Sequence, residues 1–318
     1  MINDDRLKRL ANRCWGNVLL TVCVFVASAP NSLAQSPLVQ KADSPSSQPT
    51  EHSNGNVMKL PMIVAHRGAS ADAPENTLAA FRLGWKQNAD AIEGDFFLTS
   101  DKQIVAIHDS DTQRMAGVAG DVRKKSSAEL RMLDVGRWKH RDFAGERIPT
   151  LAEVVETIPV GKTFFLEVKD SARLVPVLKQ QLTSDPAFEK LAREQLVIIA
   201  FDAEVIATSK RELPEVKAFW LTGFKTDEQT GEVRPSVEEI LSTLKTIDAD
   251  GLDCQAAEHI DQHFVNRIRA AGYQFHVWTI DEPAVAQRFA ALGVDSITTN
   301  KPQSIRHQLS LDPTNESR

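Results

Sequence analysis

Residues 63–77 read IVAHRGASADAPENT, and they outline one unit of the fold. A short apolar run rich in β-branched residues ends in HRG at 66–68, which is typical of a buried strand that meets a loop. A loop of small residues then leads to PENT at 74–77, where a helix is predicted to begin, with Asn76 or Thr77 as its cap. The stretch therefore predicts a strand, a tight turn and a helix.

The polar residues of this strand lie at its carboxyl end. In parallel barrels, functional side chains gather at that end of the strands. We therefore expect His66 to transfer protons and Arg67 to bind an anion such as phosphate. Gly68 lets the backbone turn tightly beside the ligand.

Similar apolar runs recur along the chain and alternate with helical patterns. We predict strands over residues 62–66, 91–97, 104–107, 163–168, 196–200, 217–221, 250–252, 274–278 and 295–298. Strands that alternate with helices indicate an α/β fold with a parallel sheet covered by helices. The segment that contains them, roughly 245 residues, has the usual size of a TIM (β/α)8 barrel.

One of these strands does not fit the barrel. Only residues 98–103 separate the second and third strands, whereas a parallel crossover needs about a dozen residues or more. Residues 104–107 are therefore predicted to pair antiparallel in a hairpin that places His108 above the C-terminal mouth. Residues 110–150 are predicted to form a small insertion on that face, with a helical pattern at 126–133 and the next helix starting near Thr150.

The N-terminal residues have the pattern of a targeting segment. A basic start precedes an apolar run at 14–29, and SLA at 32–34 provides the small residues of a cleavage site. Residues 1–34 are therefore predicted to be a secretory signal peptide and the protein to be periplasmic or secreted. An uncleaved membrane anchor is the alternative, although the run is short for a spanning helix.

The composition bounds the rest of the chain. Residues 35–58 are predicted to be a disordered linker, 59–306 the barrel domain and 307–318 a polar tail. The net charge of −6 without a basic block argues against a nucleic-acid partner. After signal cleavage Cys254 is the one remaining cysteine, so no intrachain disulfide is expected. No stable membrane insertion is expected once the signal has been removed. The oligomeric state is left open.

Acidic residues mark the next strand ends. Glu93 and Asp95 are two residues apart and face the same side of a strand, and Glu167 and Lys169 repeat this spacing on the following barrel strand. Three carboxylates at neighbouring strand ends form an oxygen-rich site that suits one divalent cation, Ca²⁺ or Mg²⁺. No cysteine or histidine cluster in the sequence indicates structural zinc.

The remaining candidate residues complete a phosphoryl-transfer site. His66 and His108 come from neighbouring loops and offer an acid and a base. Arg67 and Lys169 supply positive charge for a phosphate. Each motif alone also fits a structural ion pair, but the conjunction at three successive strand ends favours catalysis. Trp278 is interpreted either as an apolar wall for the leaving group or as a core aromatic residue.

At these residues the sequence resembles the glycerophosphodiester phosphodiesterase family. The matching motifs are, in order along the chain, HRG at 66–68, PENT at 74–77, EGD at 93–95, HD at 108–109, FAGERIPTL at 143–151, LEVK at 166–169 and VWT at 277–279. They run in the family's order and cover nearly all of residues 62–302. Ala200, Asp281 and TNKP at 299–302 depart from the family pattern, but none of these is a proposed catalytic group.

The resemblance implies a TIM barrel of the PLC-like phosphodiesterase type, with an insertion after the second strand. It implies metal-dependent hydrolysis of small glycerophosphodiesters to sn-glycerol 3-phosphate and an alcohol. The implied roles are acid and base for His66 and His108, metal ligands for Glu93, Asp95 and Glu167, and phosphate binding for Arg67 and Lys169. Either a water or the glycerol 2-hydroxyl attacks phosphorus, and the residues do not distinguish these routes or the order in which the histidines act.

Two other functions remain as alternatives. A sphingomyelinase D or lysophospholipase D would use a similar two-histidine site, although PENT and the Glu167–Lys169 pair favour the glycerophosphodiesterase. A binding protein for glycerophosphodiesters would need no turnover, and the intact pair of histidines argues against it. An amidohydrolase would show a His-x-His strand signature, which the sequence lacks.

Overall fold

The computed structural model describes residues 60–311. The predicted signal peptide and linker lie outside this range, as do the last residues of the predicted tail. Helix α10, Pro302–Ser310, closes the described chain, so the expected domain boundary at residue 306 falls inside a helix. Within the described part, no helix has the length and apolar character needed to cross a membrane.

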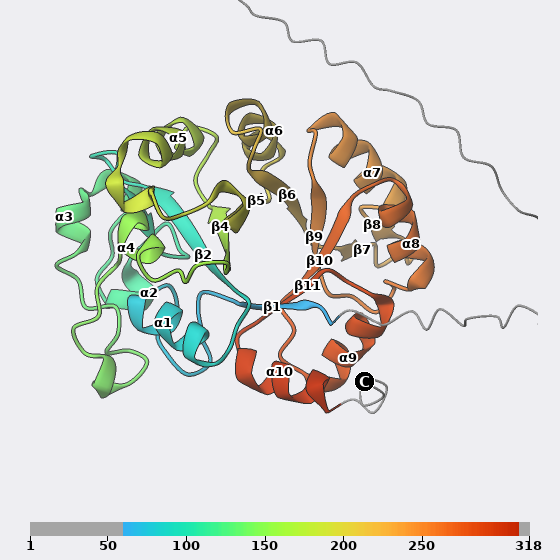
Figure 1. Ribbon diagram of the computed structural model, residues 1–318, viewed down its shortest axis with the longest axis horizontal. Coiled ribbons are helices and arrows are strands. Elements are labelled where there is room, and N and C mark those ends of the chain that lie inside the picture. Colours follow the sequence, from blue (N-terminus) through green and yellow to red (C-terminus); the bar gives the residue numbers. More distant parts are fainter. Residues whose placement is uncertain (1–59, 312–318) are drawn as a thin grey trace, which may run out of the picture. The chain divides into compact units, whose positions relative to one another are not determined.

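Parallel strands close into a barrel, as predicted (Figure 1). In order around the barrel they are β1 (Met62–Ala65), β2 (Ala91–Leu98), β4 (Thr163–Val168), β5 (Leu196–Ala200), β6 (Lys217–Thr222), β9 (Gly251–Gln255), β10 (Gln274–Trp278) and β11 (Ser296–Thr299). β1 pairs with both β2 and β11, which closes the ring. All the strand predictions are confirmed, with small shifts at their ends.

Helices form an outer ring around the strands (Figure 1). They are α1 (Leu78–Lys86), α4 (Leu151–Val155), α5 (Leu174–Ser184), α6 (Ala203–Glu212), α7 (Val237–Thr246), α8 (Gln262–Ala270), α9 (Pro283–Leu292) and α10. Two begin at the expected capping residues: Thr77 caps α1, and Thr150 forms a capping box with Glu153 on α4. The main hydrophobic core lies between this ring and the outward-facing strand residues.

The short third strand is antiparallel, as predicted. β3, Ile104–Ala106, pairs with β2 and brings the chain back to the mouth of the barrel at His108. The insertion that follows contains short helices: α2 (Gln113–Ala116), η1 (Val122–Lys124), α3 (Ser127–Leu130) and η2 (Arg141–Phe143). The helix expected over 126–133 is only four residues long. Two further 3₁₀ helices, η3 (Pro186–Phe188) and η4 (Arg193–Gln195), and a small hairpin of β7 (Lys225–Thr226) and β8 (Val233–Arg234) lie between barrel elements.

The insertion has a hydrophobic cluster of its own. Its members are Phe97, Val105, Ile107, Met115, Val122, Leu130, Val135 and Ile148. Burial of these side chains fixes the insertion on β2 and β3 although it contains little regular structure. The insertion can therefore hold His108 at a defined position beside the barrel.

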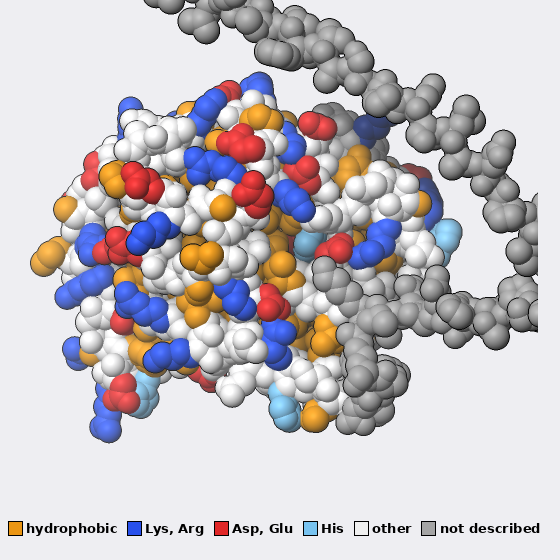
Figure 2. Space-filling view, viewed as in Figure 1, with side chains coloured by type: hydrophobic (Ala, Val, Ile, Leu, Met, Phe, Trp, Pro, Cys, Tyr) orange, Lys and Arg blue, Asp and Glu red, His pale blue; other side chains and the backbone are white. Residues whose placement is uncertain are grey.

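The interior of the barrel changes character along its axis. Its middle is apolar, with Phe165 and Phe219 packed around a buried histidine, His276. The C-terminal end is polar, with the buried carboxylates of Glu93 and Asp95. On the outside, Figure 2 shows Lys and Arg side chains interspersed with Asp and Glu on the face drawn. The molecule therefore concentrates its buried charge at one end of the barrel.

Candidate active site

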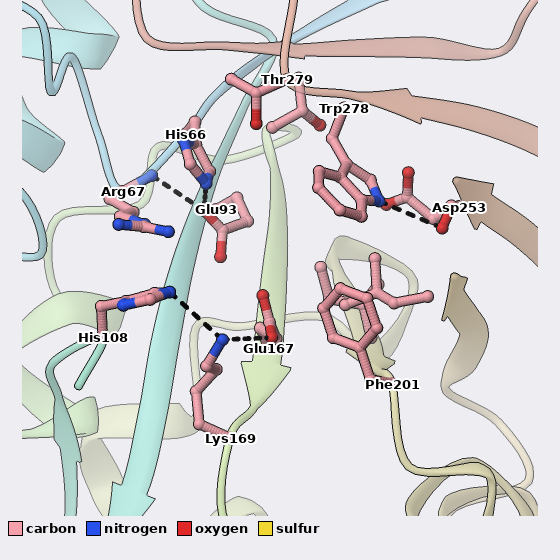
Figure 3. A pocket seen from close by; sticks show the side chains of 13 residues that line it. His66, Arg67, Glu93, His108, Glu167, Lys169, Phe201, Asp253, Trp278 and Thr279 are labelled. Carbon is pink, nitrogen blue, oxygen red and sulfur yellow. Dashed lines mark hydrogen bonds and ion pairs between the residues drawn. The ribbon is translucent and has the colours of Figure 1, made fainter. Parts of the chain in front are cut away.

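A cavity of about 160 Å³ opens at the C-terminal end of the barrel (Figure 3). The residues that line it are His66, Arg67, Glu93, His108, Glu167, Lys169, Ile199, Phe201, Leu221, Asp253, Trp278, Thr279 and Thr298. All the predicted site residues lie there except Asp95, which is fully buried and forms ion pairs with two of the lining residues. The structure therefore brings the whole predicted set together.

The turn after β1 is built for close packing. Arg67 and Gly68 both have positive φ angles, of 54° and 80°. A Cβ atom on Gly68 would lie 2.4 Å from the carbonyl carbon of Ala80, so a larger residue does not fit. The turn directs the backbone N–H of Arg67 at Glu93 Oε2, at 2.8 Å. This hydrogen bond ties the histidine-bearing loop to the acidic strand, while Gly68 lets the loop pack against α1.

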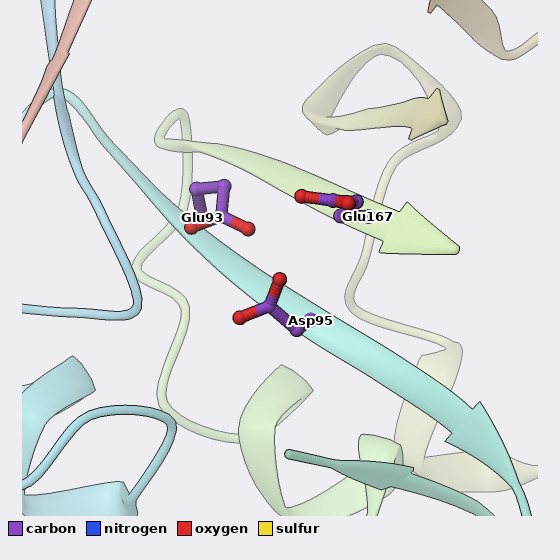
Figure 4. A group of neighbouring side chains, drawn as sticks. All are labelled: Glu93, Asp95 and Glu167. Atoms are coloured by element: carbon purple, nitrogen blue, oxygen red, sulfur yellow. The ribbon is translucent and has the colours of Figure 1, made fainter. Parts of the chain in front are cut away.

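Three carboxylates converge between β2 and β4 (Figure 4). Asp95 pairs in register with Glu167, and one oxygen from each of Glu93, Asp95 and Glu167 lies within 4.8 Å of the others. Glu93 Oε1 and Asp95 Oδ1 are buried and have no hydrogen-bond partner among residues 60–311. Buried oxygens of this kind normally have a partner. The hard oxygen donors and their missing partners together fit a divalent cation.

The pKa values show that burial and the neighbouring carboxylates oppose the charged forms of Glu93 and Glu167. Burial, and then the charges of Asp95 and Glu167, raise the pKa of Glu93 well above its usual range. Burial, and then the charge of Asp95, raise the pKa of Glu167 to about 7. Burial also opposes the charged form of Asp95, but Arg67 and neighbouring bases outweigh it and lower the pKa. A bound cation would favour the charged forms of all three carboxylates.

Two basic residues flank the carboxylates. Arg67 Nε lies 3.0 Å from Asp95 Oδ2, and its Nη1 donates to Glu75 Oε1 at 3.0 Å. Lys169 Nζ lies 2.9 Å from Glu167 Oε1. Both cations border the cavity, where they can bind an anionic ligand.

His66 is oriented by the last two barrel strands. Its Nδ1 lies 2.7 Å from Asn300 Oδ1, and Asn300 Nδ2 donates to Asp281 Oδ2 at 2.6 Å. Because Asp281 accepts from the amide nitrogen, the amide oxygen faces His66, so Nδ1 carries the proton. The unprotonated Nε2 lies 4.0 Å from Glu93 Oε2. Burial, and then the charge of Arg67, lower the pKa of His66.

His108 has a different partner, which belongs to the insertion. Its Nδ1 lies 2.6 Å from Asp109 Oδ1, and the other carboxylate oxygen accepts from Arg114 Nε at 2.6 Å. The guanidinium nitrogens of Arg114 also donate to both oxygens of Glu75. The Nε2 atom of His108 lies 3.4 Å from Lys169 Nζ. A continuous charged network therefore joins the two loops that carry the histidines.

The PENT segment supports the acidic strand as well as the helix. Asn76 Nδ2 donates to Asp95 Oδ2 at 2.8 Å, and Asn76 Oδ1 accepts from the backbone N–H of Asp95 at 3.1 Å. Glu75 joins Arg67 to Arg114. Of the two predicted caps, Thr77 is the residue that caps α1.

The opposite wall of the cavity is mostly apolar. Trp278 and Phe201 pack edge to face, with ring centroids 5.6 Å apart. Trp278 Nε1 donates to the backbone oxygen of Asp253 at 3.2 Å (Figure 3). Trp278 thus lies in the pocket wall rather than in the core between barrel and helices.

Sequence reasoning missed four residues of this site. Asn300 and Asp281 orient His66, Asp109 orients His108, and Asp253 lines the cavity. Their position along the chain was the available signal: each lies inside a barrel strand or within three residues of the end of a barrel or hairpin strand. Asp109 was already present in the HD motif.

Comparison with known proteins identifies similar chains. The model of the glycerophosphoryl diester phosphodiesterase family matches residues 66–304. A putative glycerophosphodiester phosphodiesterase, YhdW of Bacillus subtilis, is 31% identical over 255 residues, which cover 76% of this chain and 96% of the relative. A glycerophosphodiester phosphodiesterase of Caldanaerobacter subterraneus is 31% identical over 247 residues, which cover 77% of this chain and 96% of the relative.

Solved structures agree with these sequence matches. An Oleispira antarctica phosphodiesterase, solved in complex with the product sn-glycerol 3-phosphate, superposes with a TM-score of 0.69 at 28% identity. The match covers 79% of this chain and 97% of that chain. A putative glycerophosphoryl diester phosphodiesterase of Silicibacter pomeroyi has a TM-score of 0.67 at 22% identity, over 79% of this chain and 93% of that one, which supports the fold.

Proposed function

Since the chain belongs to the glycerophosphoryl diester phosphodiesterase family and is a glycerophosphodiester phosphodiesterase, we propose that it uses a divalent cation and two histidines. The substrate is a small glycerophosphodiester, and the products are sn-glycerol 3-phosphate and an alcohol. The observation that carries this proposal is the cavity itself. Two histidines, the basic side chains of Arg67 and Lys169, and a cluster of buried carboxylates surround one small space.

Glu93, Asp95 and Glu167 are the proposed ligands of Ca²⁺ or Mg²⁺. Their oxygens converge, and two of these oxygens have no hydrogen-bond partner among the described residues. When bound, the cation supplies positive charge that stabilises the phosphoryl oxygens in the transition state. Arg67 and Lys169 border the same space and are proposed to bind the phosphate directly.

His66 is the proposed general base. Its proton is on Nδ1, where Asn300 accepts it, so the lone pair on Nε2 is available for a proton from the nucleophile. Its lowered pKa keeps the ring neutral near pH 7. The nucleophile is a water molecule or the glycerol 2-hydroxyl, and in the second case a cyclic phosphate is hydrolysed in a further step.

His108 is the proposed general acid. Its orienting partner is the carboxylate of Asp109, which can balance the charge of a protonated ring, whereas the partner of His66 is a neutral amide. In the structure Nε2 lies 3.4 Å from the Lys169 ammonium, which can only donate. Once Lys169 binds the phosphate instead, a protonated Nε2 can donate to the departing alkoxide of the alcohol. The assignment thus rests on the charge of the two orienting residues.

The test of metal dependence uses the purified chain after EDTA treatment. Glycerophosphocholine and glycerophosphoethanolamine are incubated with it, with and without Ca²⁺ or Mg²⁺, and sn-glycerol 3-phosphate is measured. Release that returns only with a cation supports the proposal. Equal release without metal, or no release with either cation, contradicts it.

A variant pair tests the metal ligands separately. Glu93→Gln removes one proposed ligand and is expected to weaken cation affinity by about tenfold or more, measured by calorimetric titration. Glu258→Gln makes the same change at an exposed site and serves as the matched control. An unchanged titration in Glu93→Gln would exclude the three-carboxylate site.

Export is proposed from the sequence of residues 1–34. The basic start, the apolar run and the small residues before position 35 support a cleaved signal peptide. Expression in a bacterial host followed by N-terminal sequencing tests it. A mature protein that begins at Gln35 and is found outside the cytoplasm is expected, and an intact N-terminus would contradict cleavage.

A further inference from the structure

Asp253 lies on the side of the barrel opposite the metal-binding cluster. It belongs to β9, between β6 and β10, whereas Glu93 belongs to β2 across the ring. Its neighbours Leu252 and Cys254 face outward into the core beneath the helices, so Asp253 faces the interior. There it lines the cavity together with the catalytic groups (Figure 3).

The carboxyl group of Asp253 has no protein partner to explain its burial. The residue is 1% exposed, and its Oδ1 has no hydrogen-bond partner within residues 60–311. None of the ion pairs in this part of the chain involves it, in contrast to Asp95 and Glu167. A buried polar group without a partner is costly, so a partner supplied by the ligand is the simplest account.

The surroundings of this group select an uncharged ligand. Leu221 and Ile199 line the same part of the barrel interior, and the cations Arg67 and Lys169 are engaged at the other wall. Burial is the first cause that raises the pKa of Asp253, and the charge of Glu167 is the second. In either protonation state a carboxyl oxygen can accept from a hydroxyl, whereas an anionic phosphate offers it no donor, so the group suits a hydroxyl rather than a phosphate.

The size of the cavity suits a unit as small as the glycerol half of the substrate. Its volume of about 160 Å³ is below the roughly 300 Å³ at which pockets for drug-sized ligands begin. It therefore holds a small unit, and the variable alcohol has to extend toward the mouth. Phe201, which is 48% exposed, packs there against Trp278.

We propose that Asp253 binds the terminal hydroxyl of the glycerol unit and thereby makes the site selective for glycerol diesters over other phosphodiesters. With the phosphate at the basic wall, this hydroxyl is the substrate atom farthest from phosphorus along the glycerol chain. Asp253 would therefore contact the end of the glycerol unit that lies farthest from the reacting phosphorus. This inference rests on the proposed function and adds a specificity-determining residue to it.

The test compares two substrates in three forms of the protein. The substrates are glycerophosphocholine and the choline diester of propane-1,2-diol 1-phosphate, which keeps the hydroxyl next to the phosphate-bearing carbon and lacks the terminal one. The proteins are the wild type, Asp253→Leu and Asp253→Asn. The measured quantity is the ratio of kcat/KM for the two substrates.

The wild type is expected to prefer the glycerol diester by about tenfold or more, because a site built around a hydroxyl rejects an analogue without it. In Asp253→Leu the preference is expected to fall to about threefold or less. Asp253→Asn keeps a donor and an acceptor and is expected to retain most of it. The same preference in Asp253→Leu and wild type, or no preference in the wild type, would overturn the inference.

Two further measurements separate a loss of selectivity from a lack of turnover and from misfolding of the variants. Calorimetry with sn-glycerol 3-phosphate and its analogue lacking the terminal hydroxyl tests the same selectivity by binding, so a lack of turnover would count against the proposed function alone. Thermal unfolding tests the fold of the variants. Asp253→Leu removes an unpartnered buried carboxyl, so its melting temperature is expected to equal or exceed that of the wild type. If calorimetry shows equal affinities for the two monoesters, the inference is wrong whatever the activity.

Discussion

His66 and His108 face the same cavity but are held by different parts of the molecule. His66 is 17% exposed in its side chain and depends on Asn300 and Asp281, which follow the last two barrel strands. His108 is 30% exposed and depends on Asp109 and Arg114 of the insertion. His66 is therefore oriented by the barrel, and His108 is oriented by the insertion.

This difference indicates how one site can contain an acid and a base of the same residue type. A neutral amide beside His66 favours a neutral ring, whereas a carboxylate beside His108 can balance a charged one. In the proposed mechanism, the residue that orients each histidine therefore determines whether the ring acts as acid or base.

Loss of either histidine is expected to have the largest effect. His66→Ala and His108→Ala should each lower kcat for glycerophosphocholine by about 10²–10⁴-fold, because each removes a proton-transfer group. Cation affinity should change little, since neither is a proposed metal ligand. His263→Ala, at an exposed position, is the control. A near-normal rate in either site variant would remove that histidine from the mechanism.

Changes to the orienting residues should have smaller effects. Asp109→Asn replaces the anion beside His108 with an amide, and Asn300→Ala removes the acceptor beside His66. We expect each to lower kcat by roughly 10–100-fold with little change in KM, because the ring remains but loses its fixed tautomer. A change confined to KM would mean that these residues act on binding instead.

Arg114 acts one step further from the reaction and should matter less. It joins Asp109 to Glu75, so Arg114→Ala is expected to lower kcat by about 3–10-fold through a less rigid His108. Arg137→Ala removes an arginine from the same insertion, where its partner is Asp134 rather than a site residue, and is the matched control. Equal effects in the two variants would show a general loss of insertion stability.

His276 provides a third histidine whose role is structural. Burial against Phe219 and Phe165 lowers its pKa to about 4, so the folded protein resists its protonation. The unfolded chain binds this proton near pH 6.5. Its contribution to stability is therefore complete above pH 6.5 and falls by about 3 kcal/mol as the pH drops toward 4. The free energy of unfolding, measured with urea at pH 7, 5 and 4, should fall less with decreasing pH in His276→Phe than in the wild type. The same pH dependence in both proteins would contradict this.

The barrel and the charged wall of the site could be predicted from sequence because both follow local rules. The strand periodicity, the short 98–103 connection and the caps at Thr77 and Thr150 all act between neighbouring residues. The spacing of Glu93 and Asp95 likewise fixes their common face. Motifs on successive strand ends then meet because parallel strands end at one rim.

The site residues that could not be predicted from sequence depend on contacts between distant parts of the chain. Asn300 lies 234 residues from His66, and no local pattern relates the two. Asp253 lies between the apolar residues Leu252 and Cys254, and the direction of its side chain and its missing partner are known only from the closed barrel. Arg114 lies in an insertion whose fold depends on its own cluster rather than on periodicity.

The most direct test of the division between the histidines is the dependence of the two alanine variants on the leaving group. A 4-nitrophenyl leaving group departs without a proton, so it bypasses a general acid but still requires a general base. We predict that sn-glycerol 3-(4-nitrophenyl phosphate) restores most of the activity of His108→Ala and little of that of His66→Ala. Restoration in His66→Ala instead, or equally in both, would contradict the assigned roles.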